Sequence, residues 1–311
     1  MSHSDADLQT MLDAVSSNSL SALCSEIVPS NIALNAPLEL PEALSERDAT
    51  EALLEMANKN VVGRSAIGMG YFGTITPPVI KRNVLENPAW YTAYTPYKPE
   101  ISQGRLEALL NYQTMITEIC GYDIANASLL DESTAAAEAM AMAHRISTSE
   151  SNHFYVHEDV LPQTLAVLQT RAEPIGIILV VGDLERSESQ EYFGGLISVP
   201  GVSGQVLRDD EVTKFSANMA ARNAVSIAAV DLLYSCIATP VGQLGIDVAI
   251  GTSQRFGVPL GMGGPHAAFI ATKSEYSRSL PGRLVGVSTD TEGRPALRLA
   301  LQTREQHIRR E

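Results

Sequence analysis

The sequence predicts an α/β domain with a mainly parallel sheet. Short apolar runs such as IGIILVV (175–181), VSIAAV (225–230) and AAFIA (267–271) alternate with longer stretches that carry apolar residues three and four positions apart. The short runs are typical of strands and the longer stretches of helices. Strands that alternate with helices indicate a parallel sheet, because each parallel connection needs a crossover. The chain of 311 residues, 45% hydrophobic and 19% charged, has the composition of a globular protein.

The N-terminal residues 1–60 are predicted to form a helical segment. TMLDAV (10–15), SLSALCSEIV (19–28) and ATEALLEMANKN (49–60) show helical spacing, and prolines separate them. Residues 61–103 differ in character, because they hold five of the sixteen prolines. We expect an ordered, extended segment there that lies over another surface.

The third part, residues 104–311, is predicted to be the large α/β domain. It opens with a helix that has Ser102 near its start and Gly121 as its stop. IGIILVV is predicted to be a buried strand, and LALQTREQHIRRE (299–311) a helix without a stop signal. We therefore expect the fold to continue beyond this chain. The remaining predicted helices are 133–146, 161–172 and 209–224, and the remaining strands are 153–157, 196–199, 225–230, 246–250 and 267–271.

Charge and cysteine content narrow the function classes. The formal net charge of -14 argues against nucleic acid or an anionic membrane as a partner, since both require clustered Lys and Arg. The three cysteines lie far apart and without CxxC spacing, which favours a reducing compartment. The opening MSHSDADLQT has no basic flank or apolar core, and the longest apolar stretch contains Asp231. We expect no targeting peptide, no membrane span and a location in the bacterial cytoplasm.

Two motifs favour ordinary structural roles. GMGYFG (68–73) matches GxGxxG, but Pro77 and Pro78 follow where a nucleotide-binding helix would begin, so tight backbone turns are the better interpretation. His153 and His157 lie on one face of a predicted strand near two acidic residues, yet no third metal ligand is identifiable. We expect half-buried histidines and no metal.

Two glycine- or alanine-rich stretches leave alternatives open. In SLLDESTAAAEAM, Asp131 or Ser133 can cap a helix, and the amides near Ser133 and Thr134 can either bind an anion or simply begin a packed helix. The loop at 251–269, GTSQRFGVPLGMGGPHAAF, lets either a ligand or a partner chain approach its backbone. It lacks a P-loop lysine.

Long phrases of the sequence resemble one family. They are GMGYFGTITPPVIKRNVLENPAWYTAYTPYKPEISQGRLEALLNYQTM, IANASLLDESTAAAEAMAMAHR and SQRFGVPLGMGGPHAAF. These phrases resemble the P-protein of the glycine cleavage system, in its single-chain form, from about residue 10 to the end. The resemblance implies an aminotransferase-like fold (fold type I) repeated as two homologous halves. This chain resembles only the N-terminal half, and not all of it.

The resemblance also implies a reaction. P-proteins use pyridoxal phosphate, which withdraws electrons from the α-carbon of glycine so that carbon dioxide can leave. The aminomethyl group then passes to the lipoyl arm of the H-protein. The implied partners are glycine, the H-protein and the C-terminal half or second subunit, in a dimer of complete units.

The resemblance places the cofactor lysine outside this chain. Aligning the glycine-rich loop with the family phrase puts Gln254 where the lysine would stand, and an amide cannot form an imine. Asp231 takes the position of the aspartate that pairs with the pyridine nitrogen, and Ser133 and Thr134 are candidate, weak cofactor contacts. Lys273 is the best-placed rival lysine. Lys98 replaces the usual glutamine of the family phrase.

The aromatic stretch WYTAYTPYKPEISQGR (90–105) is the candidate active-site wall. It holds the only tryptophan and three of the ten tyrosines on a proline-stiffened segment. The resemblance implies that this segment borders the site that the C-terminal half completes, with hydroxyl and guanidinium groups orienting a small carboxylate. An aromatic staple on a domain surface is the structural alternative. The candidate wall residues are Tyr94, Thr95, Tyr97, Ser102 and Arg105.

Three functions stay open for the chain at this point. The first is a portion of glycine decarboxylase that supplies wall and interface without the cofactor lysine. The second is an inert scaffold or fragment that only associates with the other half. The third is an independent pyridoxal-phosphate enzyme that uses Lys273.

Overall fold

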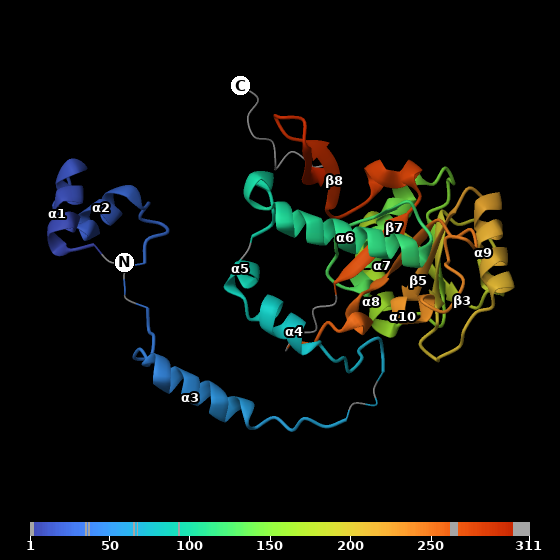
Figure 1. Ribbon diagram of the computed structural model, residues 1–311, viewed down its shortest axis with the longest axis horizontal. Coiled ribbons are helices and arrows are strands. Elements are labelled where there is room, and N and C mark those ends of the chain that lie inside the picture. Colours follow the sequence, from blue (N-terminus) through green and yellow to red (C-terminus); the bar gives the residue numbers. More distant parts are fainter. Residues whose placement is uncertain are drawn as a thin grey trace. The chain divides into compact units, whose positions relative to one another are not determined.

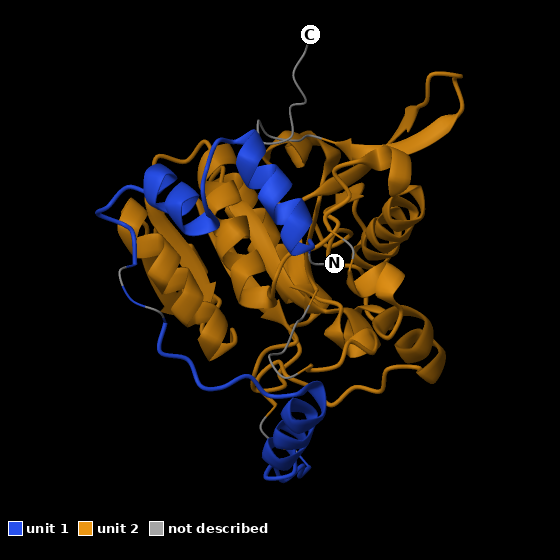
Figure 2. Cartoon of the chain, turned by 90° about the vertical axis from the view of Figure 1, so that its left-hand side faces the viewer, with its two compact units in different colours: residues 1–64 blue, residues 65–311 orange. Residues whose placement is uncertain are grey.

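The structure, a computed structural model, describes residues 3–34, 36, 38–64, 66, 68–92, 94–261 and 267–300. The chain divides into two compact units, residues 1–64 and residues 65–311 (Figure 2). Each unit is described by itself below. The three-part division at residues 60 and 103 stays a prediction.

The first unit is helical, and a serine cap begins each of its helices. The side chains of Ser4, Ser19 and Ser45 each accept a hydrogen bond from the backbone amide three residues on, at 3.1–3.2 Å. Large apolar side chains of the third helix, such as Leu53 and Leu54, are more than half exposed. The helices are α1 (Asp5–Ala14), α2 (Leu20–Ile27) and α3 (Glu46–Ala57).

The second unit begins with a stretch of short elements. Residues 71–76 have no helix, and Gly68 and Gly70 have positive φ angles of 69° and 78°, which confirms tight backbone turns in GMGYFG. Downstream, prolines begin single helical turns, so residues 78–101 are less extended than the sequence predicts. These turns are α4 (Pro78–Ile80), α5 (Pro88–Tyr91) and η2 (Pro99–Ile101), and the π-helix η1 (Lys81–Leu85) directly follows α4.

A seven-stranded sheet forms the centre of the second unit (Figure 1). Its order is β1-β7-β6-β5-β4-β2-β3; strands β2 to β6 are parallel, and β7 is antiparallel to both of its neighbours. The prediction of a mainly parallel sheet is therefore confirmed. The strands are β1 (Ile124–Ala125), β2 (His153–His157), β3 (Ile178–Gly182), β4 (Gly194–Val199), β5 (Val225–Asp231), β6 (Val248–Thr252) and β7 (Ala268–Thr272).

Helices cover both faces of this sheet. On β2, Phe154 and Val156 pack in one apolar cluster with α7 and α8, whereas Tyr155 packs in the other with α6 and α9. Side chains that alternate between two buried faces explain why the central strands are almost wholly apolar. The helices are α6 (Gln103–Cys120), α7 (Glu132–Ile146), α8 (Pro162–Ala172), α9 (Asp209–Ala221) and α10 (Leu232–Ser235), with 3-10 turns η3 (Glu173–Ile175), η4 (Glu185–Glu188), η5 (Gln254–Phe256) and η6 (Ser274–Ser279).

Two predictions about strands and helices are wrong. IGIILVV is not a fully buried strand, because β3 is the edge of the sheet and leaves Ile178 and Val181 48% and 45% exposed. Leu299 and Ala300 are not helical; they end a two-stranded antiparallel sheet of β8 (Leu284–Thr289) and β9 (Pro295–Ala300) that packs on α6. The rest of that predicted helix, residues 301–311, lies outside the described residues.

The helices that the structure describes include none with the length and apolar character needed to cross a membrane.

Candidate functional site

The carboxyl ends of the parallel strands meet at one edge of the sheet and border a cavity of about 280 Å³. Ser198, Asp231 and Thr252 line it from the ends of β4, β5 and β6, and Glu132 lines it from the start of α7. In open α/β sheets, ligands bind at this edge. The polar residues that line this cavity are therefore candidates for ligand binding or catalysis.

Asp231 is fully engaged at this edge. One carboxylate oxygen accepts a hydrogen bond from the backbone amide of Tyr234 (2.9 Å) and so caps α10. The other lies 3.4 Å from a guanidinium nitrogen of Arg255. The same guanidinium lies over the ring of Phe72, with 4.2 Å between its carbon and the ring centroid. The charge of Asp231 is thus balanced within the protein.

Gln254 is 1% exposed and makes a reciprocal pair with the backbone of Phe72. Its Nε2 donates to the Phe72 carbonyl (2.9 Å), and its Oε1 accepts from the Phe72 amide (3.4 Å). Both ends of the side-chain amide are therefore satisfied by segment 68–73. The loop residues Gly263, Gly264 and Pro265, on which the family alignment depends, lie outside the described residues.

The start of α7 is a capped helix end. Asp131 accepts a hydrogen bond from the amide of Thr134 (2.7 Å), and the hydroxyl of Ser133 lies 3.1 Å from that of Thr164. The prediction that Asp131 or Ser133 caps this helix is confirmed for Asp131. The amide of Thr134, one of the anion-binding candidates, is used by this cap.

Glu132 adds a second acidic group to the cavity. The pKa of the Glu132 carboxyl is raised to about 7, mainly because burial removes it from water; the hydrogen bond from Thr164 opposes this rise, and the charges of Asp231 and Asp131 add to it. The cavity therefore holds two carboxyl groups and one guanidinium, a poor environment for a phosphate dianion.

Lys273 lies at the opposite edge of the sheet. It follows β7, whose last residue, Thr272, pairs with Val248 at the start of β6. Its ammonium group is 2.6 Å from Asp247, which also accepts hydrogen bonds from the amide and hydroxyl of Ser226. Lys273 thus belongs to a polar link between strands, away from the cavity at the carboxyl edge.

The candidate wall residues form a separate group. Arg105 donates to the carbonyl of Tyr94 (2.6 Å) and to the hydroxyl of Ser102 (3.1 Å). Tyr94 is 89% exposed, whereas Ser102 is buried. Arg105 therefore holds the backbone of the segment while the Tyr94 ring projects into solvent.

Three further residues belong to this segment. The carbonyl of Thr95 accepts a hydrogen bond from the amide of Tyr97 (2.7 Å), and Lys98 is exposed. The hydroxyl of Tyr97 accepts a hydrogen bond from Arg283 (3.1 Å). Sequence reasoning did not single out Arg283, because it lies 186 residues away in a stretch without any motif. The structure joins Tyr94, Ser102 and Arg105 in one group and Asp231 with the Gln254 region in another.

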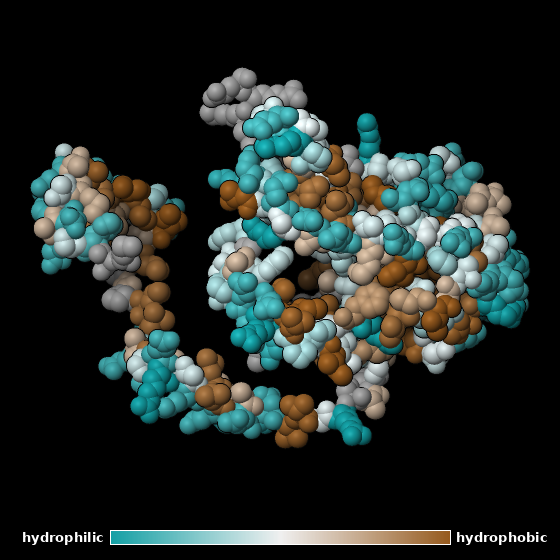
Figure 3. Space-filling view, in the orientation of Figure 1, coloured by the Kyte–Doolittle hydropathy of each residue, from teal (hydrophilic) through white to brown (hydrophobic). Residues whose placement is uncertain are grey.

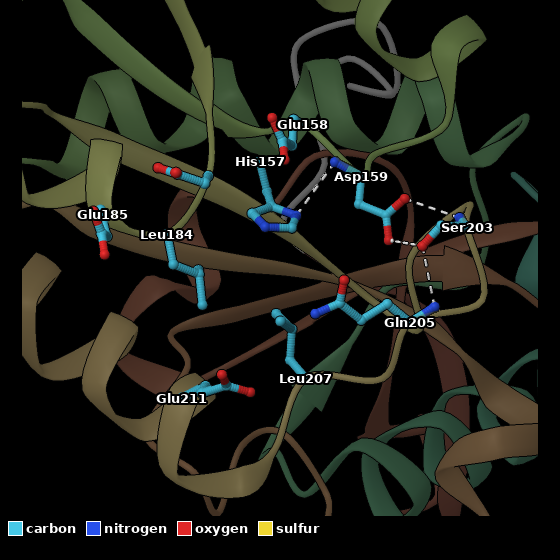
Figure 4. Close-up of a pocket in the computed structure, with 10 residues that line it drawn as sticks. His157, Glu158, Asp159, Leu184, Glu185, Ser203, Gln205, Leu207 and Glu211 are labelled. Atoms are coloured by element: carbon cyan, nitrogen blue, oxygen red, sulfur yellow. Dashed lines mark hydrogen bonds between the residues drawn. The ribbon is translucent and has the colours of Figure 1, made fainter.

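A larger cavity of about 650 Å³ lies at the ends of β2 and β3, and half of the residues that line it are acidic (Figure 4). Its His157 accepts a hydrogen bond from the amide of Asp159 (3.3 Å), and Asp159 in turn accepts from the amide and hydroxyl of Ser203. Burial lowers the pKa of the His157 imidazole, although the nearby carboxylates act in the opposite direction. Among the described residues, no set of His, Cys, Asp and Glu has the arrangement of a metal site.

The seven-stranded, mainly parallel sheet, with antiparallel β7 beside β6, helices on both faces and polar residues at the carboxyl edge, has the architecture of an aminotransferase-like protein of fold type I. The model of the glycine cleavage system P-protein family matches residues 1–311. The chain belongs to this family.

Individual relatives agree. The chain is 54% identical over 306 residues to the glycine dehydrogenase (decarboxylating) of Vibrio campbellii and 56% identical over 306 residues to that of Bradyrhizobium diazoefficiens. Each alignment covers 98% of this chain but 32% of the relative, so the chain spans about a third of their length. A crystal structure of glycine decarboxylase (P-protein) in inhibitor-bound form is 35% identical, with a TM-score of 0.86 over 97% of this chain and 69% of that one.

The carboxyl-edge cavity does not fit pyridoxal phosphate, the cofactor that the family resemblance implies. No lysine is among the described residues that line it. The two residues that the resemblance aligns with cofactor contacts already have other partners: Gln254 is hydrogen-bonded to Phe72, and Asp231 forms an ion pair with Arg255. The amide of Thr134 already binds a carboxylate.

Proposed function

We propose that this chain is part of a glycine decarboxylase of the bacterial cytoplasm that acts with pyridoxal phosphate and passes the aminomethyl group of glycine to a lipoylated H-protein. The observation that carries the proposal is the match of the whole chain to the P-protein family, together with relatives named for this reaction. Because those relatives are about three times as long, we infer that the rest of the protein, or a second subunit, supplies the cofactor lysine.

The contribution of this chain is a wall of the active site and the surface that meets the missing part. Tyr94, Thr95, Tyr97, Ser102 and Arg105 are the residues of that wall. The contacts of Arg105 support this role, because they fix the backbone beside an exposed tyrosine ring. A phenol ring held at low entropy cost is suited to orienting a small ligand.

Exposed apolar side chains in the same stretch support an interface. Ile75, Val79 and Ile101 are 89%, 63% and 78% exposed, and Figure 3 shows brown side chains where Figure 1 places α4. Large apolar side chains left this exposed are typical of a partner contact when several occur in one segment. The partner that we propose is the remainder of the P-protein, in a dimer of complete units.

The position of Lys273 supports the assignment of the cofactor lysine to the missing part. Its ammonium group forms an ion pair with Asp247 at the edge away from the polar cavity. The chain by itself is therefore expected to be inactive.

The test combines this chain with the remaining two thirds of a family member, lipoylated H-protein, pyridoxal phosphate and glycine, and measures release of labelled carbon dioxide. We expect release from the combination and none from the chain alone. Tyr94→Phe and Arg105→Ala should lower the rate at least tenfold. Arg145→Ala is the matched control, since Arg145 also donates to a backbone carbonyl, that of Ser279 at 3.1 Å.

Borohydride reduction of the same mixture separates the alternatives. We expect the label on a lysine of the added part. A stoichiometric label on Lys273 would overturn the proposal and make the chain a cofactor enzyme in its own right. Association of the two parts without carbon dioxide release would instead support an inert scaffold.

A further inference from the structure

Residues 71–76 form an extended strip with two different faces. Phe72, Thr74 and Thr76 are partly buried, whereas Tyr71 and Ile75 are 48% and 89% exposed. This alternation is that of a strand with one face against the protein. The strip is not part of either sheet, so other groups must hold it.

The inward face is held by residues 254–258. The hydroxyl of Thr74 donates to the carbonyl of Val258 (2.8 Å), and that of Thr76 donates to the carbonyl of Gly257 (2.7 Å). The side-chain amide of Gln254 bonds both backbone groups of Phe72. One side chain thus supplies the donor and the acceptor that a neighbouring strand would otherwise provide.

Two further contacts strengthen this attachment. Arg255 lies between the Phe72 ring and the carboxylate of Asp231, so the cation contacts both. Gln163 of α8 donates to the carbonyl of Met69 (2.6 Å) just before the strip. Arg105 separately holds the candidate wall residues farther along the chain, through its hydrogen bonds to Tyr94 and Ser102.

We infer that Gln254 is a positioning residue: it anchors the strip at 71–76 to the carboxyl edge of β5 and β6. Residues 71–105 thus have two fixed points: Gln254 holds the strip at their start, and Arg105 holds the candidate wall residues at their end. This inference rests on the proposed function for the part that concerns catalysis. The attachment itself is a property of this chain.

The test uses the chain combined with the rest of the P-protein. Gln254→Met keeps the length of the side chain and removes the amide. The matched control is Gln113→Met, because the buried Gln113 makes the same reciprocal pair with the backbone of Val285, at 3.1 and 2.8 Å. Hydrogen exchange measured by mass spectrometry reports on the peptide that spans residues 70–77, and glycine turnover and bound cofactor are measured on the same samples.

We expect Gln254→Met to speed exchange in this peptide about tenfold and to lower kcat/KM for glycine by a similar factor, since a lost net hydrogen bond is worth about that much. Bound cofactor should stay constant, which a general loss of folding would not allow. Gln113→Met should leave exchange in this peptide unchanged. If Gln254→Met does not fold, Thr74→Val with Thr76→Val removes two anchors from the other side.

Unchanged exchange in the Gln254→Met peptide would overturn the anchor. Faster exchange with unchanged turnover would overturn its role in positioning the wall. Absence of turnover in the unmodified combination would overturn the proposed function instead, while the exchange result would still decide whether Gln254 anchors the strip.

Discussion

The carboxyl group of Glu132 provides a quantitative test of the cavity at the sheet edge. Its pKa rises from 4.5 to about 7, first because burial removes it from water and then because Asp231 and Asp131 repel its charge. A pKa that is higher in the folded state means that ionisation is costly there. The stabilising contribution of this group is therefore complete below pH 4.5 and is lost as the pH rises toward 7.

The size of the effect follows from the two pKa values. At about 1.4 kcal/mol per pH unit, the rise from 4.5 to about 7 corresponds to about 3 kcal/mol of unfolding free energy. The variant Glu132→Gln keeps an oxygen for the hydrogen bond from Thr164 and cannot ionise. It should gain about 2 to 3 kcal/mol relative to the unmodified chain between pH 5 and pH 8.

Urea unfolding followed by circular dichroism at pH 5, 6, 7 and 8 measures this difference. Glu107→Gln removes a carboxyl group from the exposed side of α6 and corrects for the change in net charge. A difference between Glu132→Gln and the unmodified chain that stays constant from pH 5 to pH 8 would refute the reasoning. It would mean that Glu132 is well solvated or balanced by a cation.

Three further outcomes are expected. Gln254→Lys, treated with pyridoxal phosphate and borohydride, should give no stoichiometric label at position 254, because Arg255 still forms an ion pair with the carboxylate of Asp231. A full label would contradict the conclusion that this cavity does not fit pyridoxal phosphate. Gly201→Ala should lower the unfolding free energy by about 1 to 3 kcal/mol in thermal unfolding, since the added carbon would lie 1.8 Å from an oxygen of Asp159; an unchanged midpoint would show that this loop yields freely. Asp247→Ala should cost about 1 to 3 kcal/mol in urea unfolding, because a backbone amide of β5 loses its acceptor; a neutral effect would show that water replaces it.

Sequence patterns predicted those parts of the fold that depend on local periodicity. The helix at 103–120 was predictable from its apolar face and from Gly121, which ends it in a left-handed conformation. The burial of Ile178 was not, because an apolar run has the same pattern at the edge of a sheet as at its centre. Strand order is decided by contacts between distant residues, which no local window contains.

The candidate site shows the same limit. Gln254 and Asp231 could be singled out from their phrases, but their partners could not. Arg255 is adjacent in sequence to Gln254 and looks like an ordinary surface cation until Asp231 and Phe72 are placed on either side of it. Arg283, the partner of Tyr97, carries no sequence signal for the same reason.

The attachment of the strip has a consequence for the order of events during synthesis. Phe72 and Gln254 are 182 residues apart in the chain. At about 5 to 20 residues per second, a ribosome needs roughly 10 to 40 s to make the second residue after the first. Throughout that interval the inward face of the strip has no anchor, and Ile75 on its outward face is uncovered. In newly made chains the polar inward face of this strip therefore stays unpaired until residues 254–258 emerge, whereas Ile75 stays exposed even after they do.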